Sequence, residues 1–340
     1  MTYIGVDIQK FISTAVVIND DEKIVAQYID FETTPEGLDK VFDNYDPADC
    51  RIVIENLTTA HRVYHHLKPK GFTIYVLHTG DGCVTEISKS KFKTDLEDAT
   101  KLATICKDIS TGRRKYRLAH IPSEKEMRAK SLCRVLNQFS EDRDKYNLRI
   151  QELMNLNGFT LPGRLKSFIS KTALKYIRSL GHEALARMAD AVEFLNEQIE
   201  LSKKELESLY SEDQDAKNLM SVKGISIQTA ATILSSIDGI ERFDTPEKLV
   251  SHFGLDLTIH SSGGKESKRH ISKQGDPLVR KLMANVVAKH PRYYPNSALA
   301  EFYKRMKEKM PHWKAITAAM RKLTCIIWAM LTRHEVYRCS

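Results

Sequence analysis

Four acidic residues in the first third of the chain have the types and spacing of a metal-dependent phosphodiester site. Asp95 and Asp98 lie three positions apart in a segment with helical periodicity, so both project from one helix face. Asp7 and Glu55 each end a short apolar run that we predict to be a strand. Such acids can converge on two divalent metal ions. Each alone is more often a turn or surface residue, so the prediction rests on their combination.

The elements that must position these acids can be predicted from periodicity. We expect strands over residues 2–8, 12–19, 23–30, 50–55 and 72–78, with helices over about 34–44, 58–68 and the segment with Asp95. Three antiparallel strands followed by alternating strands and helices predict an α/β domain with a mixed sheet. This is an RNase H-like order, with Asp7 on the central strand. No G-x-G-x-x-G follows the first strand, and no glycine follows Asp7, which disfavours Rossmann and actin-like sugar kinase folds.

From residue 121 the chain is predicted to be mostly helical. Ser123 and Glu126 form a capping-box pattern after Pro122. A later heptad pattern predicts a coiled coil or a long antiparallel helical hairpin, although a plain amphipathic helix is about as common. A coiled coil would imply homo-oligomerisation. The heptad positions are Leu185, Met188, Val192, Leu195, Ile199, Ser202, Leu206 and Leu209.

Residues 219–226 resemble the turn of a helix-hairpin-helix. Lys223 and Gly224 would let backbone amides and the start of a helix near Ile227 face a phosphate. Glycine is also the commonest residue after a helix, so this pattern alone is weak.

A serine segment near the C-terminus could supply a nucleophile. Ser261 and Ser262 precede two glycines, and a run of cations follows: Lys265, Lys268, Arg269 and Lys273. A serine among cations could attack a phosphodiester, because the cations would stabilise charge on the phosphoryl oxygens. Most Ser-Gly-Gly segments are exposed linkers, and local chemistry alone favours that alternative.

The net charge of +8 is concentrated at the C-terminal end. Residues 256–340 hold 17 Lys/Arg and 6 Asp/Glu, whereas the remaining residues hold 35 and 38. Such a basic segment is typical of a polyphosphate partner, although it can also be a lysine-rich surface. Aromatic residues interleave with its cations, as in a nucleic-acid groove. The cations include Arg280, Lys281, Lys304, Arg305, Lys307, Lys309, Arg321 and Lys322, and the aromatics are Tyr293, Tyr294, Tyr303, Trp313 and Trp328.

Two further classes of protein are disfavoured. The six cysteines include no C-x-x-C pair, so neither a zinc site nor a disulfide framework is predicted. No run of about eighteen apolar residues and no secretory leader is evident, so we expect neither a membrane span nor secretion.

Taken in order, these motifs resemble the insertion-sequence transposases with a DEDD tetrad, which include the Piv-type DNA invertases. The resemblance covers nearly the whole length, and its most specific part is Lys93-Thr94-Asp95-x-x-Asp98-Ala99. The sequence departs from the family pattern where Asn56-Leu57-Thr58 replaces the usual Ala-Thr-Gly, and where His78-Thr79 replaces a common Asn-Pro. The other matching segments are 4–10, Glu55, 224–231, 242–243, 254–255, 262–263, 271–275, 278–280, 321–323 and 327–328.

The resemblance implies a DNA transposase or recombinase. Asp7, Glu55, Asp95 and Asp98 would bind Mg²⁺, two ions per site, in a RuvC-like fold. Ser262 would form a phosphoserine link to cleaved DNA, and Ser261 stays an alternative nucleophile. Donor and target DNA, a non-coding bridge RNA and a homo-oligomer (dimer or tetramer) would be the partners, with one copy's serine meeting another's carboxylates. A bacterial cytoplasmic, nucleoid-associated location follows.

Three domains are expected on this basis. A RuvC-like nuclease domain would span 1–120, a helical or coiled-coil region 121–215, and a mostly α-helical transposase domain with the serine 216–340. The predicted nucleic-acid contacts are Lys223, Lys265, Lys268, Arg269, Lys273, Arg280, Arg321 and Lys322. Two other functions fit the pattern: a RuvC-like structure-specific nuclease that uses water, and a non-catalytic nucleic-acid-binding relative.

Overall fold

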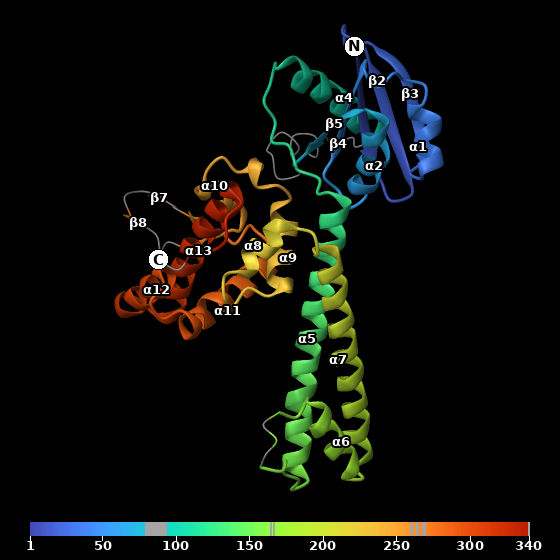
Figure 1. Ribbon diagram of the computed structural model, residues 1–340. Coiled ribbons are helices and arrows are strands. Elements are labelled where there is room, and N and C mark those ends of the chain that lie inside the picture. Colours follow the sequence, from blue (N-terminus) through green and yellow to red (C-terminus); the bar gives the residue numbers. More distant parts are fainter. Residues whose placement is uncertain are drawn as a thin grey trace. The chain divides into compact units, whose positions relative to one another are not determined.

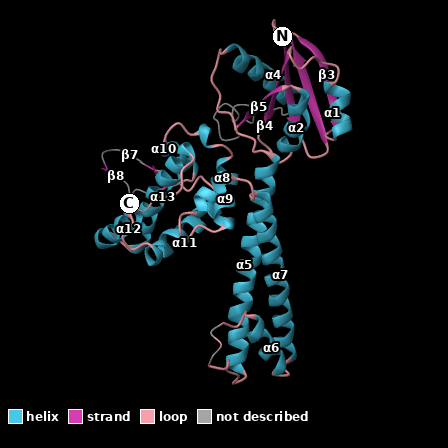
Figure 2. Ribbon diagram, in the orientation of Figure 1, coloured by secondary structure: helices cyan, strands magenta, loops and turns pink. Residues whose placement is uncertain are grey.

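The computed structural model divides into two compact units, Met1–Ile121 and Pro122–Ser340. It describes residues 1–78, 94–163, 165, 167–258, 261–262, 265–266 and 270–338, with only the backbone for 258, 261–262 and 265–266. Strands form the body of the first unit and helices that of the second (Figures 1 and 2). The division at residue 121 is one residue from the predicted end of the first domain. The boundary predicted between residues 215 and 216 stays a prediction.

The first unit is built on a five-stranded mixed sheet, as predicted. The strand order is β3-β2-β1-β4-β5, with β1 in the centre, antiparallel to β2 and parallel to β4. The strands are β1 (Thr2–Ile8), β2 (Ile12–Ile18), β3 (Ile24–Glu32), β4 (Cys50–Glu55) and β5 (Thr73–Leu77). Its helices are α1 (Pro35–Phe42), α2 (Ala60–Leu67), the 3-10 turn η1 (Lys68–Lys70) and α4 (Asp95–Thr111).

Two apolar clusters cover the two faces of this sheet. Side chains of α1 and α2 pack with alternate residues of β1 and β4, such as Ile4 and Ile52. Helix α4 packs against the other set, which includes Tyr3 and Val53. Because successive strand residues point to opposite faces, this division also assigns the face of every other residue in β1 and β4. Helix α4 lies over the sheet in Figure 1.

The second unit is mostly helical and begins with two long helices. Helices α5 and α7 run antiparallel side by side, with α6 packed at their far end (Figure 1). The remaining helices form a separate core around α13. The helices are α5 (Glu124–Leu156), α6 (Lys171–Ser179), α7 (Glu183–Leu209), α8 (Gln214–Met220), α9 (Ile227–Ile237), α10 (Pro246–His252), α11 (Pro277–Tyr293), α12 (Ala298–Lys309) and α13 (His312–Arg333), with the 3-10 turn η2 (Ile240–Arg242).

The heptad pattern of α7 is satisfied inside the chain. Its residues pack against α5 and α6, so the antiparallel hairpin was the correct alternative and the apolar seam is covered by the same chain. Ser202 is buried in this seam, whereas Met188 and Leu209 are only partly buried. Oligomerisation through this seam therefore loses its support.

The predicted capping box at the start of α5 is only half formed. The Ser123 hydroxyl accepts a hydrogen bond from the Glu126 amide at 3.3 Å, but the Glu126 carboxylate accepts one from the buried Tyr210 hydroxyl instead of reaching back. The Ser123 amide donates to Asp238 Oδ2 at 3.0 Å. Tertiary packing has redirected the carboxylate, and burial raises the pKa of Glu126.

The C-terminal helices include the predicted hairpin and one long apolar helix. Helix α8 ends at Met220 and α9 begins at Ile227, so the predicted hairpin lies between two helices. Helix α13 alone, within the part of the chain that the structure describes, is long and apolar enough to cross a membrane. Leu323 and Ile327 on this helix are fully buried in the domain core, as expected for a core helix.

Candidate metal centre and serine segment

Asp7 and Glu55 are aligned by the register of two parallel strands. Val6 of β1 pairs with Ile54 of β4, so the next residue on each strand is a carboxylate. Parallel neighbours end at the same edge of a sheet, and the spacing between adjacent strands is about 4.8 Å. Both residues are half-buried. The sheet therefore places two acids side by side.

The two acids also share one face. Gly5 lies against α4, and Asp7 is two residues further along the same strand, so its side chain leaves the sheet toward α4. Val53 belongs to the apolar cluster with α4, and Glu55 follows it by two residues. The alternation that builds the core thus directs both carboxylates toward the helix with the other two acids.

Helix α4 runs antiparallel to β1, and its first turn lies beside Asp7. A Cβ atom on Gly5 would stand 2.2 Å from the Ala99 carbonyl oxygen and 2.1 Å from the Ala103 nitrogen. Only glycine allows helix and strand backbones to approach this closely. At the end of β1, Gln9 Nε2 donates to Asp95 Oδ2 at 2.9 Å. The start of α4 therefore lies at the edge where β1 ends.

Asp95 and Asp98 differ in environment. Asp95 is exposed, whereas Asp98 is buried at 7% exposure, at the start of the contact between α4 and the sheet. Lys101 Nζ lies 3.6 Å from Asp98 Oδ1. The sequence alone assigned no role to Lys101, although a lysine three residues after Asp98 on a helix is a signal for such a pair.

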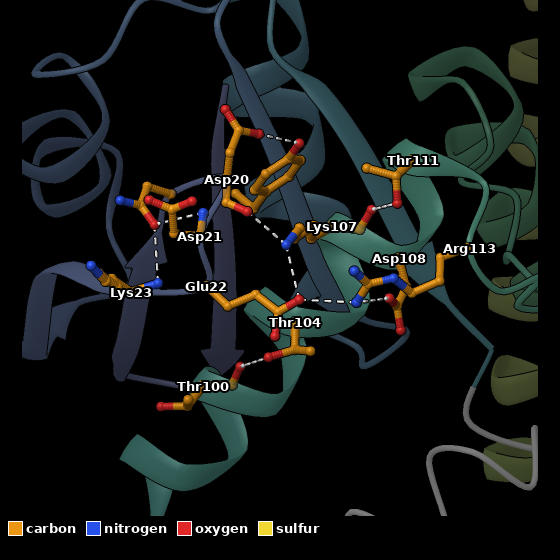
Figure 3. A network of polar contacts seen from close by, with 12 residues as sticks. Asp20, Asp21, Glu22, Lys23, Thr100, Thr104, Lys107, Asp108, Thr111 and Arg113 are labelled. Atoms are coloured by element: carbon orange, nitrogen blue, oxygen red, sulfur yellow. Dashed lines mark hydrogen bonds and ion pairs between the residues drawn. The ribbon is translucent and has the colours of Figure 1, made fainter.

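The opposite end of α4 is fixed by a polar network, shown in Figure 3. Lys107 is buried, and its Nζ donates to the Asp20 carbonyl at 2.7 Å and to Glu22 Oε1 at 2.9 Å. Arg113 also donates to Glu22 Oε1. The bonds from Lys107 and then Arg113 lower the pKa of Glu22. This network ties α4 to the β2–β3 turn and so helps set where its acidic end lies.

The four acids fit a hard divalent cation by chemistry. All of their donors are carboxylate oxygens, the ligands that Mg²⁺ prefers. The backbone brings the four residues to one edge and one face of the sheet. Within the described residues, however, no three Asp, Glu, His or Cys side chains stand close enough together to hold one ion. The structure thus supports a common location for the four acids and leaves their joint coordination a prediction.

The serine segment belongs to the second unit and is closed at its base by short strands. Strand β6 (Leu257–Thr258) pairs antiparallel with β9 (His270–Ile271). Strand β7 (Ser261–Ser262) pairs with β8 (Lys265–Glu266), with Ser262 opposite Lys265. The structure does not describe the side chains of the four residues in β7 and β8. Lys268 and Arg269, and Lys93 of the DEDD motif, lie wholly outside the described part of the chain.

Two glycines let the flanks of this segment meet backbone to backbone. Gly254 has a φ of +67°, and a Cβ atom there would stand 2.6 Å from the Gly275 nitrogen. A Cβ atom on Gly275 would stand 2.3 Å from the His252 carbonyl oxygen. The amide of Lys273 also donates to the Gly254 carbonyl at 3.0 Å. We call the flanking residues 252–256 and 272–275 the clamp.

Arg280 completes the clamp. Its Nη1 donates to the Gly275 carbonyl at 2.7 Å and to the Phe253 carbonyl at 3.1 Å, and partial burial lowers its pKa. Sequence reasoning assigned this arginine to nucleic acid. The structure shows it binding the chain's own backbone, and its contact with nucleic acid stays a prediction.

The other predicted contact residues occupy varied settings. Lys223 and Lys273 are exposed. Arg321 and Lys322 line a cavity of about 370 Å³ together with Asp256.

Among the aromatic residues proposed to stack bases, Tyr293 and Trp313 are exposed at 60% and 74%. Tyr303 is buried, and Trp328 Nε1 donates to the Phe243 carbonyl at 2.8 Å. Tyr303 and Trp328 therefore have structural roles. The interleaved pattern of cations and aromatics did not distinguish a buried helix face from a nucleic-acid groove.

The comparisons with known proteins identify the class. A mixed sheet that gathers four acids, followed by a mostly helical unit, is compatible with the RuvC-like domain of DEDD transposases. A transposase model of the DEDD, IS110 type matches residues 4–157, and the model of the transposase IS116/IS110/IS902 family matches residues 216–304. The first range contains all four acids, and the second contains Ser262. The chain is thus a DNA transposase, an enzyme of DNA recombination.

Individual relatives agree. The chain is 27% identical to the transposase for insertion sequence element IS1111A of Coxiella burnetii, over 73% of this chain and 69% of the relative. It is 23% identical to a probable family 20 transposase of Pseudomonas aeruginosa, over 85% and 86%. It is 21% identical to the transposase for insertion sequence element IS1328 of Yersinia enterocolitica, over 85% of each chain. The chain belongs to the IS110 family of DEDD transposases.

Proposed function

We propose that this transposase cleaves and rejoins DNA through a covalent serine intermediate at a magnesium site made by Asp7, Glu55, Asp95 and Asp98. The observation that carries the proposal is that strand register, strand alternation and the direction of α4 bring all four acids to one edge and face of the sheet. Bound Mg²⁺, two ions per site, would neutralise charge on the scissile phosphate.

The covalent step assigns each group a role. The Ser262 oxygen forms a bond to the phosphorus while the bond to one sugar oxygen breaks. The serine proton passes to a carboxylate of the acid site, and the released sugar oxygen takes a proton. The reverse exchange, with a new sugar hydroxyl as the attacking group, rejoins the DNA and frees the serine. Ser261 is the alternative nucleophile.

The partners follow from charge and family. The basic C-terminal segment would supply much of the DNA affinity and make it depend steeply on salt. We propose that a non-coding bridge RNA guides the reaction to donor and target DNA in the bacterial cytoplasm, at the nucleoid. We also propose a dimer or tetramer in which the serine of one copy meets the acids of another.

Trapping the adduct tests this function. The full chain, with the RNA that co-purifies with it, is incubated with Mg²⁺ and a nicked substrate that cannot be rejoined. A covalent protein–DNA band is expected for the wild type and for Ser261→Ala, and none for Ser262→Ala. Cleavage by Ser262→Ala at the wild-type rate without a band would instead indicate a nuclease that uses water. A wild-type protein that neither cuts nor links DNA would indicate a non-catalytic relative.

A further inference from the structure

A hollow of about 600 Å³ lies at the edge of the sheet where β1 and β4 end. Gln9 and Lys10 line it just after β1, and Leu57, Thr58 and Thr59 line it just after β4. Gln9 also donates to Asp95, so the hollow adjoins the acid site through a direct hydrogen bond. Its size falls in the range of small-ligand sites.

The lining of this hollow suits an anion with an attached flat ring. Lys10 and Arg62 supply positive charge, and none of the described residues that line the hollow is acidic. Thr58 and Thr59 carry hydroxyl donors, and the Thr59 side chain does not cap α2. Leu57 supplies apolar surface that is 38% exposed. A phosphate next to a base has this combination of needs.

An exposed aromatic ring neighbours the residues that line the hollow. Phe11 follows Lys10, and its side chain is 71% exposed. Most of this apolar ring is therefore left in contact with water. Lys10 Nζ lies 4.9 Å from the centre of its ring. An ammonium group beside an exposed ring is a pairing that can bind a phosphate and stack its base at once.

The rim is held in place by Arg62. Its guanidinium donates to the carbonyls of Lys10 and Thr33, at 3.5 Å for Lys10. It therefore ties the turn after β1 to the start of α1 from its own position on α2. A surface fixed in this way loses less entropy when a ligand binds.

We propose that this hollow binds one nucleotide of the DNA strand beside the scissile phosphate, with Lys10 on its phosphate and Phe11 stacked on its base. The inference rests on the proposed function and adds the strand's path across the sheet edge. DNA is favoured over RNA because the hollow joins the acid site directly through Gln9.

Photocrosslinking tests the proposal without any cleavage. The full chain in EDTA is irradiated with single-stranded DNA that carries 5-iodouracil, and crosslinked peptides are mapped by mass spectrometry. A crosslink at Phe11 is expected. In anisotropy titrations with the same strand, Phe11→Ala should weaken binding about fivefold or more. Lys10→Ala should weaken it about threefold to tenfold and reduce the salt slope by about 0.7.

Two matched controls calibrate these effects. Lys23→Ala removes an exposed lysine at the β2–β3 turn, and Phe194→Ala removes a ring that is 57% exposed on α7. Both should bind as the wild type does. Crosslinks confined to residues 122–340, unchanged binding by both hollow variants, or weakening seen only with RNA of the same sequence would overturn the proposal. If serine adducts form normally in such a case, the proposed function still stands. A Phe11 crosslink without any serine adduct would support nucleotide binding by the hollow but not the proposed function.

Discussion

The acid site and the serine segment are built on opposite kinds of scaffold. The acids lie at the ends of β1, β4 and α4, whose backbones meet at Gly5 in the middle of a buried core. The serine lies between the two arms of the clamp, which meet at Gly254 and Gly275 at the segment's base. Folding of one unit fixes the acids relative to one another. In the proposed mechanism the serine must reach these acids from the other unit, which folding of the first unit does not by itself achieve.

The largest effect is expected from removing one acid charge. Asp7→Asn should reduce Mg²⁺-dependent cleavage and adduct formation on the order of 10³-fold, because several kcal/mol of charge stabilisation is lost. DNA affinity in EDTA should stay within about twofold, since the basic segment lies elsewhere in the chain. Gel assays of both steps check this. Asp30→Asn, the same change at an exposed site on β3, is the control. Wild-type cleavage by Asp7→Asn would remove the acid site from the mechanism.

A methyl group at Gly5 should be the next most damaging change. Gly5→Ala places a carbon against the backbone of α4, which must move, and we expect a loss of about 3 kcal/mol in the free energy of unfolding of the first unit. Urea unfolding measures it. Gly163→Ala, where nothing lies within 4 Å, should be neutral. Equal stability of the two variants would show that the close approach of β1 and α4 does not hold the acids.

Loss of the clamp's arginine should affect the serine side selectively. Arg280→Met removes two charged hydrogen bonds to partly buried backbone carbonyls and should cost about 2 kcal/mol of stability. The adduct yield should fall, while binding of Mg²⁺ to the acids, measured by calorimetry, should not change. Lys281→Met loses an exposed pair with Glu141 and should cost under about 1 kcal/mol. If both variants lose adduct equally, general nucleic-acid affinity and not the clamp is responsible.

The smallest effect concerns a buried acid of the helical unit. Burial raises the pKa of Glu126, so its contribution to stability is present below the unfolded value near 4.5 and is lost as pH rises through the folded pKa. Glu126→Gln keeps an acceptor for Tyr210 and cannot ionise. It should therefore unfold at higher urea concentration than the wild type at pH 7 to 8, with no difference near pH 4.

An exposed partner of Arg128 supplies the control for that experiment. Glu205→Gln should not stabilise the protein at any pH. The contribution of Glu22 in the first unit to stability has the opposite pH dependence. The hydrogen bonds from Lys107 and Arg113 lower the pKa of Glu22, so this contribution is lost as the solution becomes acidic. A Glu126→Gln variant that is less stable than the wild type at pH 7 would contradict the assignment of a raised pKa.

Amino-acid periodicity alone was enough to predict the strands of the sheet and the positions of the candidate acids. Each strand of the first unit was predicted within about two residues, because alternating burial and turn residues are local properties. The placement of Asp7 and Glu55 at strand ends and of Asp95 and Asp98 on one helix came from the same source. The family assignment was likewise carried by short motifs in a fixed order.

Only the tertiary structure shows which surface each helix or strand face packs against. Periodicity shows that one side of α7 is buried, but not that α5 of the same chain covers it. It marks Arg280 and Trp328 as cationic and aromatic, whereas their carbonyl partners at Gly275 and Phe243 are set by packing. The direction of α4 over Gly5, and so the meeting of its acids with Asp7, depends on contacts between residues nearly a hundred positions apart. Such contacts are selected by the fit of whole surfaces, which no local pattern records.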